Sequence, residues 1–578
     1  MYKTSSNPTL QLQPWRAWLT LGSLLLLFSV LVGRAAYLQG YQEEFLREQG
    51  EARYGRRLTL EANRGAITDR NGEPLAISSP AQSIWASPSA MAELKPKQLS
   101  DLAQALGVPE NDLRRRLADK KRDFVYLKRH LPPGDAERVM RLGVPGVFKQ
   151  AEYRRFYPDG EMMAHVIGYT DIDNKGQEGF ELTKESMLAG RLGSRHVIRD
   201  RRGYVVEDVA SIEQPRDGQT LTLSIDRKIQ YIAFRELKNT IETHRAKAGG
   251  IVVLDAKTGE VLALANLPTY NPNNRGRFEP AVRRNRAVTD LYEPGSTMKP
   301  ISIAAALESG KYSPDTVVST GGGAYTIGPN TIHDTHAYGA LTVEGVVQKS
   351  SNIGTAKIAL TLDRDYLWEF YDQVGIGEPP HTGFPGEASG RLRPWKSWRP
   401  IEQATMSYGY GLSVSLIQIA KAYQIFATDG QIRPITFQRL VAPLPGRRVI
   451  SAENAMAVRK MLEMVTQPGG TAIRAQVPGY RVGGKTGTAK KLSSGGYSSE
   501  HYVASFVGIA PISDPRLIVA VMIDEPTVGG YYGGVVAAPA FSRVVKETLR
   551  TLGVPPDAPL NNILLPNPDE PEVKEEPF

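Results

Sequence analysis

The sequence of 578 residues contains no cysteine. Disulfide scaffolds, cysteine nucleophiles, zinc ribbons and iron–sulfur clusters are therefore excluded. The chain also has no block of five or more like charges and no internal repeat, so we expect no nucleic acid partner. A mean hydropathy of −0.30 excludes a polytopic membrane protein. With 41% hydrophobic and 23% charged residues, the composition is that of a globular protein too long for a single domain.

One segment departs from this average, because it carries no charge over 17 residues, from Ala17 to Gly33. A helix of this length spans about 26 Å, at about 1.5 Å per residue. Extension to Leu38, with Arg34 snorkelling to the surface, reaches the hydrocarbon thickness of about 30 Å. We therefore predict a single transmembrane helix over residues 17–38.

The rival interpretation of this segment is a cleaved signal peptide, because Gly33 and Ala35 are small residues at plausible cleavage positions. The apolar core is longer than the usual length of about 7 to 15 residues, which favours the spanning helix. Lys3 and Arg16 favour a cytoplasmic location for residues 1–16. In a bacterium, everything after residue 39 would then lie in the periplasm, anchored in the inner membrane, where the missing cysteines avoid unwanted disulfides.

The rest of the chain divides by composition into four regions. Residues 39–57 are polar, with Glu and Arg at helical spacing, and are predicted to form a stalk. Residues 58–220 alternate short strand-like runs with charged helices and contain no compact catalytic constellation. Residues 221–555 carry the motifs described below. The last 23 residues, 556–578, are rich in Pro, Asn, Asp and Glu, and we expect a disordered tail.

The region from 221 to 555 is predicted to combine an antiparallel sheet with a helical cluster, an α+β fold. Its clearest signal is a hairpin from Gly250 to Ala265, with the turn Lys257-Thr258-Gly259. Two more strands are predicted at Tyr502–Ile509 and Leu517–Ile523, and helical patterns occur between 296 and 470.

The most informative stretch is Tyr292-Glu-Pro-Gly-Ser-Thr-Met-Lys-Pro300. The Pro-Gly pair breaks the chain and Pro300 is tolerated only in a first helical turn, so a helix is predicted from about Ser296 to Ser309. Ser296 and Lys299 then share one face of that turn. A serine hydroxyl is a poor nucleophile until a neighbour removes its proton, and a partly desolvated lysine can do so. The helix N-terminus also offers backbone N–H groups for an oxyanion.

Two further motifs follow in order. Lys349-Ser350-Ser351-Asn352 places its first serine 54 residues after Ser296, and Gly484-Lys485-Thr486-Gly487-Thr488 places Lys485 another 135 residues on. Ser-x-x-Lys, Ser-Asp-Asn and Lys-Thr-Gly in this order are typical of serine enzymes that react with β-lactams. In this chain the middle motif is Ser-Ser-Asn. Three motifs in the right order are far less probable by chance than any one alone.

With these motifs the chain resembles the class B penicillin-binding proteins, the serine D,D-transpeptidases of peptidoglycan synthesis. The likeness extends to residues 58–220, which match the family's pedestal at Arg64–Ala76, Arg155–Pro158 and Gly176–Glu181. The Gly, Pro and charged residues there are interpreted as turns and scaffold salt bridges. The resemblance implies a membrane-anchored protein with an elongated pedestal domain of the dimerisation type. A transpeptidase domain with the penicillin-binding or β-lactamase-like fold would follow it.

Within the class, Glu293–Lys299, Lys349–Gly354 and Lys485–Lys491 resemble the division-type, FtsI-like branch, as does Gly409–Ala420. The elongation-type branch is the close alternative. Two alternatives of other kinds stay open: a division scaffold with secondary catalysis and a penicillin-sensing receptor. The receptor is less favoured, because only about 16 residues precede the anchor and leave no room for a signalling domain.

The resemblance implies a role for each motif residue. Ser296 would attack the carbonyl between the two terminal D-alanines of a stem peptide, with Lys299 accepting its proton. Ser350 would relay that proton to the departing D-alanine, and the N–H groups of Ser296 and Thr488 would hold the oxyanion. Asn352 would hydrogen-bond Lys299 and the donor backbone. The residues implied to bind the substrate are Asn352, Lys485, Thr486, Gly487 and Thr488.

The resemblance also implies the partners. They are peptidoglycan stem peptides, β-lactams that acylate the same serine, a polytopic glycosyltransferase such as FtsW, and other divisome proteins. No cofactor and no metal are implied. The glutamates between the second and third motifs lack a Glu-x-x-Leu-Asn context, so transfer to an amine is favoured over hydrolysis. The net charge of +9 leaves an anionic polymer or membrane surface open as a neighbour.

Three motifs are interpreted as structural. Residues 479–486 satisfy the P-loop pattern but lack the preceding apolar strand and the following helix. Lys257-Thr258-Gly259 precedes the nucleophile and is interpreted as a hairpin tip. His333-Asp334-Thr335-His336 lacks the spacing of a zincin helix and is interpreted as a solvated loop rather than a metal site.

Overall fold

The structure is a computed structural model of the whole chain, and it describes residues 14–42, 55–199, 205–274, 279–493 and 496–565. Helix α1 runs from Pro14 to Ala36 and continues as a π-helical turn, η1, from Tyr37 to Tyr41. It is long and apolar enough to cross a membrane, and none of its residues is buried. Together, α1 and η1 begin three residues before the predicted anchor and end three residues after it, and they form a candidate single-pass membrane span.

The predicted stalk, residues 39–57, differs from the structure at both ends. Residues 39–41 continue the helical segment, and β1, Gly55–Leu60, is already a strand. Residues 43–54 lie outside the described residues, as do 1–13 of the predicted cytoplasmic segment.

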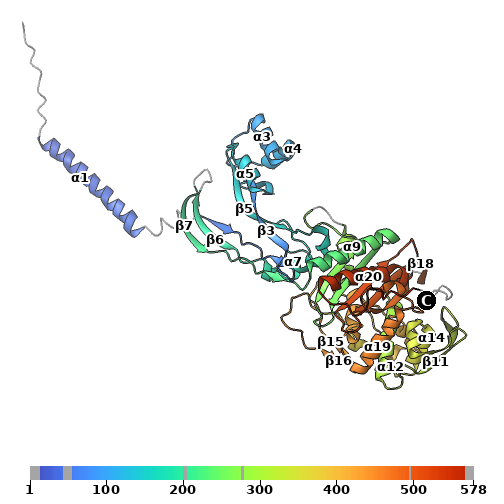
Figure 1. Cartoon of the computed structure of the whole chain (residues 1–578). Helices are drawn as coiled ribbons and strands as arrows, with labels where there is room; N and C mark the ends of the chain where they lie inside the picture. Colours follow the sequence, from blue (N-terminus) through green and yellow to red (C-terminus); the bar gives the residue numbers. More distant parts are fainter. Residues whose placement is uncertain (1–13, 43–54, 200–204, 275–278, 494–495, 566–578) are drawn as a thin grey trace, which may run out of the picture. The chain divides into compact units, whose positions relative to one another are not determined.

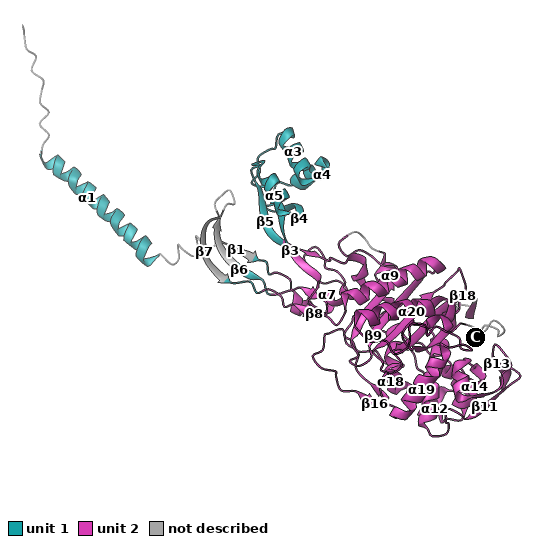
Figure 2. Cartoon of the chain, viewed as in Figure 1, with its two compact units in different colours: residues 1–62, 80–152, 191–216 teal, residues 63–79, 153–190, 217–578 magenta. Residues whose placement is uncertain are grey.

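The described residues form two compact units that do not follow the predicted regions. Figure 2 colours them separately. One comprises residues 1–62, 80–152 and 191–216, and the other comprises 63–79, 153–190 and the chain from 217 onward. The predicted pedestal, residues 58–220, is therefore divided between the two units.

The first unit contains an antiparallel sheet and a small α/β lobe. The sheet has the order β1-β6-β7, with β6 at Gly193–Arg199 and β7 at Val205–Glu213. In the lobe, leucines from two helices and one strand pack into a core with Ile84, for example Leu102, Leu113 and Leu127. The lobe's elements are β3 (Pro74–Ala86, which begins in the other unit), α3 (Pro96–Leu106), α4 (Glu110–Leu117), β4 (Val125–Leu131), α5 (Pro133–Met140) and β5 (Val147–Phe156, which ends in the other unit).

The second unit is built on a five-stranded antiparallel sheet with the order β10-β9-β19-β18-β17. Its strands are β9 (Ala248–Asp255), β10 (Val261–Leu267), β17 (Gly483–Ser493), β18 (Gly496–Ala510) and β19 (Leu517–Asp524). The hairpin and both later strands predicted from the sequence are confirmed. The turn at Gly259, with φ +79°, joins β9 to β10, as expected for Lys257-Thr258-Gly259.

Helices cover both faces of this sheet, and β9 is therefore buried at every residue. Helices α9 (Arg227–His244) and α20 (Gly533–Thr551) pack together against it, while α11 (Arg286–Thr289) and α17 (Leu416–Ala422) also contact the sheet (Figure 1). The remaining helical cluster includes α12 (Lys299–Glu308), α14 (Asn352–Leu360), α16 (Pro400–Ser407) and α19 (Ala452–Val465). A strand buried on both faces reads as a continuous apolar run, which explains why Ile251–Leu254 shows no alternation.

The pedestal motifs within the second unit form a buried ion-pair cluster. Glu181 accepts from Arg64 Nε at 2.6 Å and from Arg155 Nε at 2.7 Å, and all three side chains are almost fully buried. Gly168 has no room for a side chain, because a Cβ there would lie 1.8 Å from the carbonyl oxygen of Glu178. The interpretation of these residues as turns and scaffold salt bridges is confirmed.

The first part of the predicted disordered tail is instead bound to the second unit. Asp557 accepts from the N–H of Arg481 at 2.8 Å and from the hydroxyl of Ser513 at 2.6 Å. Asn562 accepts from the N–H of Gly479 at 3.0 Å. These polar side chains satisfy backbone groups of a turn, a role that composition does not reveal. Residues 566–578 of the tail lie outside the described residues.

Candidate active site

The candidate nucleophile lies in a 3-10 turn that precedes the α-helix. Gly295–Met298 forms this turn, η3, and α12 begins only at Lys299. The turn starts at Gly295 with φ +54°, and the helix ends at Glu308 shortly before Gly310. In a 3-10 helix residues i and i+3 eclipse, so Ser296 and Lys299 lie on the same side, as predicted. Their exposed fractions are 8% and 1%.

Lys299 joins the first motif to the second. Its Nζ donates to the carbonyl oxygen of Ser350 at 2.5 Å and to the Ser350 hydroxyl at 3.0 Å. Ser350 has φ +60°, in the left-handed region that few residues other than glycine adopt. Such a conformation persists only where the surroundings hold it. Here it turns both oxygens of Ser350 toward the buried Nζ of Lys299.

The second motif is held by the loop His333–His336, which the sequence analysis interprets as solvated. Ser351 caps α14 by accepting from the N–H of Gly354, and its hydroxyl donates to Asp334 Oδ2 at 2.5 Å. Asp334 Oδ1 accepts from the N–H of Ile353 at 3.0 Å. The Asn352 amide donates to the carbonyl of His333 at 3.2 Å. The interpretation of this loop as solvated holds for the exposed His333 side chain and is wrong for the half-buried Asp334.

The same loop gives no sign of a metal site. Within the described ranges, no three His, Asp or Glu side chains gather closely enough to hold a metal ion. His333 and His336 are both exposed. The Asp334 carboxylate between them caps the N-terminus of α14.

The third motif lies on β17, at one end of the strand order. Lys485 is fully buried, and its Nζ donates to the Thr486 hydroxyl at 3.1 Å. That hydroxyl also shares a hydrogen bond of 2.8 Å with Thr471. Lys485 pairs with Val507 in the antiparallel ladder with β18. A P-loop wraps its N–H groups around a phosphate, so this strand is not one.

Gly487 brings β17 against the nucleophile turn. A Cβ at this position would lie 2.4 Å from the Ser505 hydroxyl and 2.8 Å from the carbonyl oxygen of Pro294. Only glycine fits at this spacing, so β17, which carries the third motif, approaches the turn because residue 487 has no side chain. The next residue, Thr488, accepts through its hydroxyl from the N–H of Gly533 at 3.0 Å.

A fourth segment supports the same turn, and its role was not predicted. The N–H of Gly295 donates to the carbonyl of Gly409 at 3.2 Å, and the Tyr410 hydroxyl donates to the carbonyl of Thr488 at 3.3 Å. The N–H of Gly411 donates to Glu293 Oε1 at 2.8 Å. Gly409-Tyr410-Gly411 follows helix α16 in the structure, but from the sequence such a tripeptide predicts only a loop.

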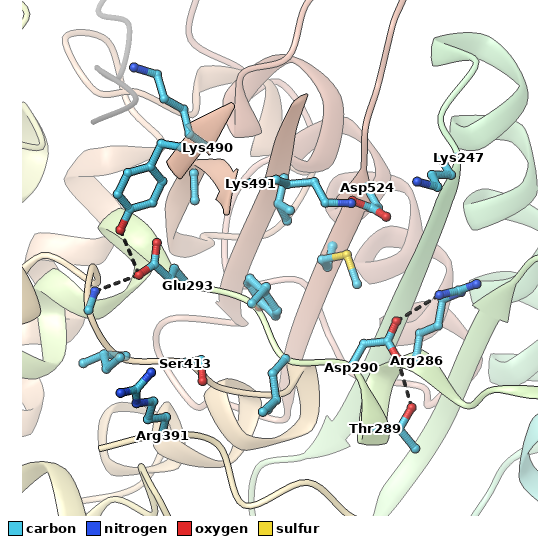
Figure 3. A pocket seen from close by; sticks show the side chains of 18 of the residues that line it. Lys247, Arg286, Thr289, Asp290, Glu293, Arg391, Ser413, Lys490, Lys491 and Asp524 are labelled. Carbon is cyan, nitrogen blue, oxygen red and sulfur yellow. Dashed lines mark hydrogen bonds and ion pairs between the residues drawn. The ribbon is translucent and has the colours of Figure 1, made fainter. Parts of the chain in front are cut away.

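A charged cavity of about 960 Å³ opens beside the nucleophile turn (Figure 3). Its wall includes Glu293, three residues before Ser296, and Ala489, directly after Thr488. Seven basic and three acidic side chains line it, a net charge of +4. The cavity therefore begins where the first and third motifs meet and carries an excess of positive charge.

Comparisons with known proteins identify the family. A model described as the penicillin-binding protein transpeptidase domain matches residues 249–546. A second, described as the penicillin-binding protein dimerisation domain, matches residues 59–223. The chain belongs to the penicillin-binding protein transpeptidases. The predicted class B architecture, with an α+β transpeptidase domain, a dimerisation-type domain and an N-terminal anchor candidate, is confirmed.

Relatives in the family match almost the whole chain. A probable peptidoglycan D,D-transpeptidase PenA of Neisseria meningitidis is 46% identical over 549 residues, which is 94% of each chain. Peptidoglycan D,D-transpeptidase FtsI of Escherichia coli is 40% identical, covering 94% of this chain and 93% of its own. Among solved structures, the apo transpeptidase domain of Burkholderia pseudomallei penicillin-binding protein 3 is 51% identical with a TM-score of 0.55. It covers 58% of this chain and 98% of that one.

Proposed function

We propose that this member of the family is a peptidoglycan D,D-transpeptidase that cross-links stem peptides at the division septum through a serine acyl-enzyme. The observation that carries the proposal is the position of Lys299. It follows Ser296 by one 3-10 turn, and its Nζ donates to both the carbonyl and the hydroxyl of Ser350. Ser296 and Lys299 lie on one side of the same turn and Lys299 contacts Ser350, so a nucleophile, a base and a proton relay lie close together.

Acylation uses these three residues in sequence. Ser296 Oγ attacks the carbonyl between the two terminal D-alanines while neutral Lys299 takes its proton. The C–N bond then breaks, and the proton passes through the Ser350 hydroxyl to the nitrogen of the departing D-alanine. The products are an ester on Ser296 and a free D-alanine amine. The N–H groups of Ser296 and Thr488 stabilise the oxyanion formed between these steps.

Strand β17 orients the donor peptide. As the last strand in the sheet order, it offers an edge to which an extended peptide can add through main-chain hydrogen bonds. The Lys485 ammonium, together with the hydroxyls of Thr486 and Thr488, binds the terminal carboxylate of the donor. Gly487 keeps the edge close to Ser296, and Asn352 binds the donor backbone from the opposite side.

The acyl-enzyme is resolved by an amine of a second stem peptide. The amine nitrogen attacks the ester carbonyl, a C–N bond forms, and the bond to Ser296 Oγ breaks. The attacking nitrogen loses a proton to Lys299, and Lys299 passes a proton to Ser296 Oγ. A β-lactam acylates the same serine by opening its ring, which makes the protein an antibiotic target.

The anchor and the relatives support the proposed cellular placement. Helix α1 supports a single-pass protein of the bacterial inner membrane, with the catalytic unit in the periplasm. Relatives named FtsI favour the division role over the elongation role. The partners in this proposal are a polytopic glycosyltransferase such as FtsW, contacted through the anchor and the pedestal, and other divisome proteins. The pedestal and catalytic regions, residues 58–220 and 221–555, keep the boundaries predicted from the sequence as part of the same proposal.

Labelling with a fluorescent penicillin tests the chemistry. The full-length wild type should label covalently with one equivalent, and Ser296→Ala should not label. Ser309→Ala, which removes a hydroxyl at the far end of the same helix, is the matched control and should label like the wild type. Covalent labelling of Ser296→Ala, or none of the wild type, would refute the assignment.

Depletion in the host separates the division role from its alternative. Filamentous cells are expected if the protein serves septation, whereas round cells would assign it to elongation. A second experiment expresses Ser296→Ala in the depleted cells and asks whether division is restored. If this variant restored division, the protein would act chiefly as a scaffold.

A further inference from the structure

The C-terminal segment that follows α20 is bound to the second unit by its polar groups. We call residues 556–564 the C-terminal strap. Its polar side chains point toward the turn at 476–481, whereas Leu560 and Leu564 are 77% and 48% exposed. The Gln476 side chain also exchanges hydrogen bonds of 2.7 and 3.0 Å with the backbone of Leu564. This is the reverse of the usual pattern, in which apolar side chains are the buried ones. Polar contacts therefore decide where the strap lies.

Asn562 binds the tip of this turn with both ends of its amide. Its Oδ1 accepts from the N–H of Gly479 at 3.0 Å, and its Nδ2 donates to the carbonyl oxygens of Tyr480 at 3.0 Å and Val477 at 3.3 Å. The N–H of Ala558 adds a hydrogen bond of 3.1 Å to the carbonyl oxygen of Gly479. One side chain of the strap thus satisfies three backbone groups of the turn and stabilises its conformation.

Asp557 joins the segment that enters β17 to the segment that leaves β18. Its Oδ1 accepts from the N–H of Arg481, two residues before β17 begins, at 2.8 Å. Its Oδ2 accepts from the hydroxyl of Ser513, three residues after β18 ends at Ala510, at 2.6 Å. The Arg481 guanidinium also pairs with Glu463 on α19 at 2.7 Å. A single carboxylate of the strap therefore holds the start of the β17–β18 ladder together.

The start of β17 depends on such external support, because it is rich in glycine. Gly483, Gly484 and Gly487 are three of its first five residues. Lys485 and Thr486, which the proposed function places on the donor carboxylate, lie between the last two. Glycine weakens a strand, since it has many accessible conformations and no side chain to pack. Among the described strands β17 forms a ladder only with β18. The position of the Lys485 ammonium is thus sensitive to whatever holds the residues just before it.

We propose that Asp557 and Asn562 are positioning residues of the donor carboxylate site, and that they act through the turn at 476–481 on the start of β17. The inference rests on the proposed function, which takes the donor carboxylate to bind at Lys485. Lys485 lies only four positions after Arg481, so a contact that fixes Arg481 restricts the strand close to the ammonium. Neither positioning residue needs to touch the substrate. The C-terminal strap therefore supports acylation from outside the site.

The test compares two β-lactams that differ only in the carboxylate. The full-length protein is acylated with benzylpenicillin and with benzylpenicillin methyl ester, and the ratio of the two second-order rate constants is measured. The ester keeps the reactive ring and lacks the negative charge that Lys485 binds. A variant that is partly unfolded reacts more slowly with both compounds in equal measure. The ratio therefore reports on the carboxylate site and is independent of the folded fraction.

The double variant Asp557→Ala/Asn562→Ala should lower this ratio about tenfold, because small displacements of a positioned group are costly. Each of the two single variants should lower the ratio by a smaller factor, and they decide the question if the double variant does not fold. Asn561→Ala removes the exposed amide directly before Asn562. It is the matched control and should keep the wild-type ratio.

A wild-type ratio in the double variant, or in both single variants, would overturn the inference even if the melting temperature fell, because the strap would then serve stability alone. An equal loss in Asn561→Ala would overturn it too. A wild type that is not acylated, or that reacts equally with both compounds, would contradict the proposed function itself. A wild type that prefers the free acid, together with variants that keep this preference, overturns this inference alone.

Discussion

The carboxylate of Asp334 accepts a hydrogen bond of 2.5 Å from the hydroxyl of Ser351, which lies between the two polar residues of the second motif. The same carboxylate caps the N-terminus of α14 through the N–H of Ile353. Ser350 and Asn352 flank Ser351, so one loop carboxylate holds the segment that carries both. Asp334 is a positioning residue and does not need to touch the substrate.

Replacing this carboxylate should weaken both stability and acylation. Asp334→Ala leaves the buried Ser351 hydroxyl without its acceptor, and the expected loss is about 1.5–3 kcal/mol for a charged hydrogen bond. Asp334→Asn keeps one acceptor oxygen and should lose less. The measurements are the melting temperature and the second-order rate constant of penicillin acylation. An alanine variant with wild-type values in both would show that the loop plays no positioning role.

Lys299 should be indispensable for acylation. Lys299→Ala removes the base next to Ser296 and leaves the Ser350 carbonyl without its donor. Loss of a positioned general base costs about 10²–10⁴-fold in rate. Stopped-flow labelling with a fluorescent penicillin measures the change. Lys311→Ala, which removes an exposed lysine just beyond the same helix, should acylate at the wild-type rate.

Gly487 should not tolerate a methyl group. In Gly487→Ala the new Cβ meets the Ser505 hydroxyl and the Pro294 carbonyl, so β17 must move away from the nucleophile turn. Overpacking of this kind costs about 1–3 kcal/mol. Gly322→Ala is the control, because nothing lies within 4 Å of its Cβ. Calorimetry should show a lower melting temperature, and penicillin labelling a slower acylation, for Gly487→Ala only. Equal melting temperatures and labelling rates for the two variants would contradict the close approach of β17 to the turn.

Acid should weaken the first unit through Glu152. Burial alone would raise the pKa of this carboxyl, but hydrogen bonds from His130 and Ser83 and the charge of Arg129 lower it to about 2. Because the folded pKa lies below the ordinary value of 4.5, the stabilisation is complete above pH 4.5 and is lost as the pH falls toward 2.

The variant Glu152→Gln tests this dependence. Its melting temperature should fall less between pH 6 and pH 3 than that of the wild type, since the titrating group is gone. Glu93→Gln removes an exposed carboxylate of the same unit and should keep the wild-type pH dependence. Identical pH profiles for Glu152→Gln and the wild type would contradict the prediction.

The three motifs, the hairpin and the membrane helix were predictable because each depends on neighbours in the chain. Pro294-Gly295 interrupts the backbone just ahead of Ser296, and the turn brings Lys299 to the same side over three residues. The apolar run from residue 17 is long enough to span a bilayer as a helix, and this prediction does not depend on the rest of the chain. The order of the motifs then identified the chemistry without any knowledge of distances.

The supports of the site were not predictable, because they join residues far apart in the sequence. Asp334 looked like part of a solvated loop until Ser351, 17 positions later, lay against it. The motifs singled out Gly409 and Gly487, but the sequence did not show that the nucleophile turn packs against both of them. Residues 557–564 looked disordered until the turn at 476–481 offered them backbone groups. Local composition sets which conformations a segment can adopt, whereas the partners of its polar groups depend on the packing of the whole chain.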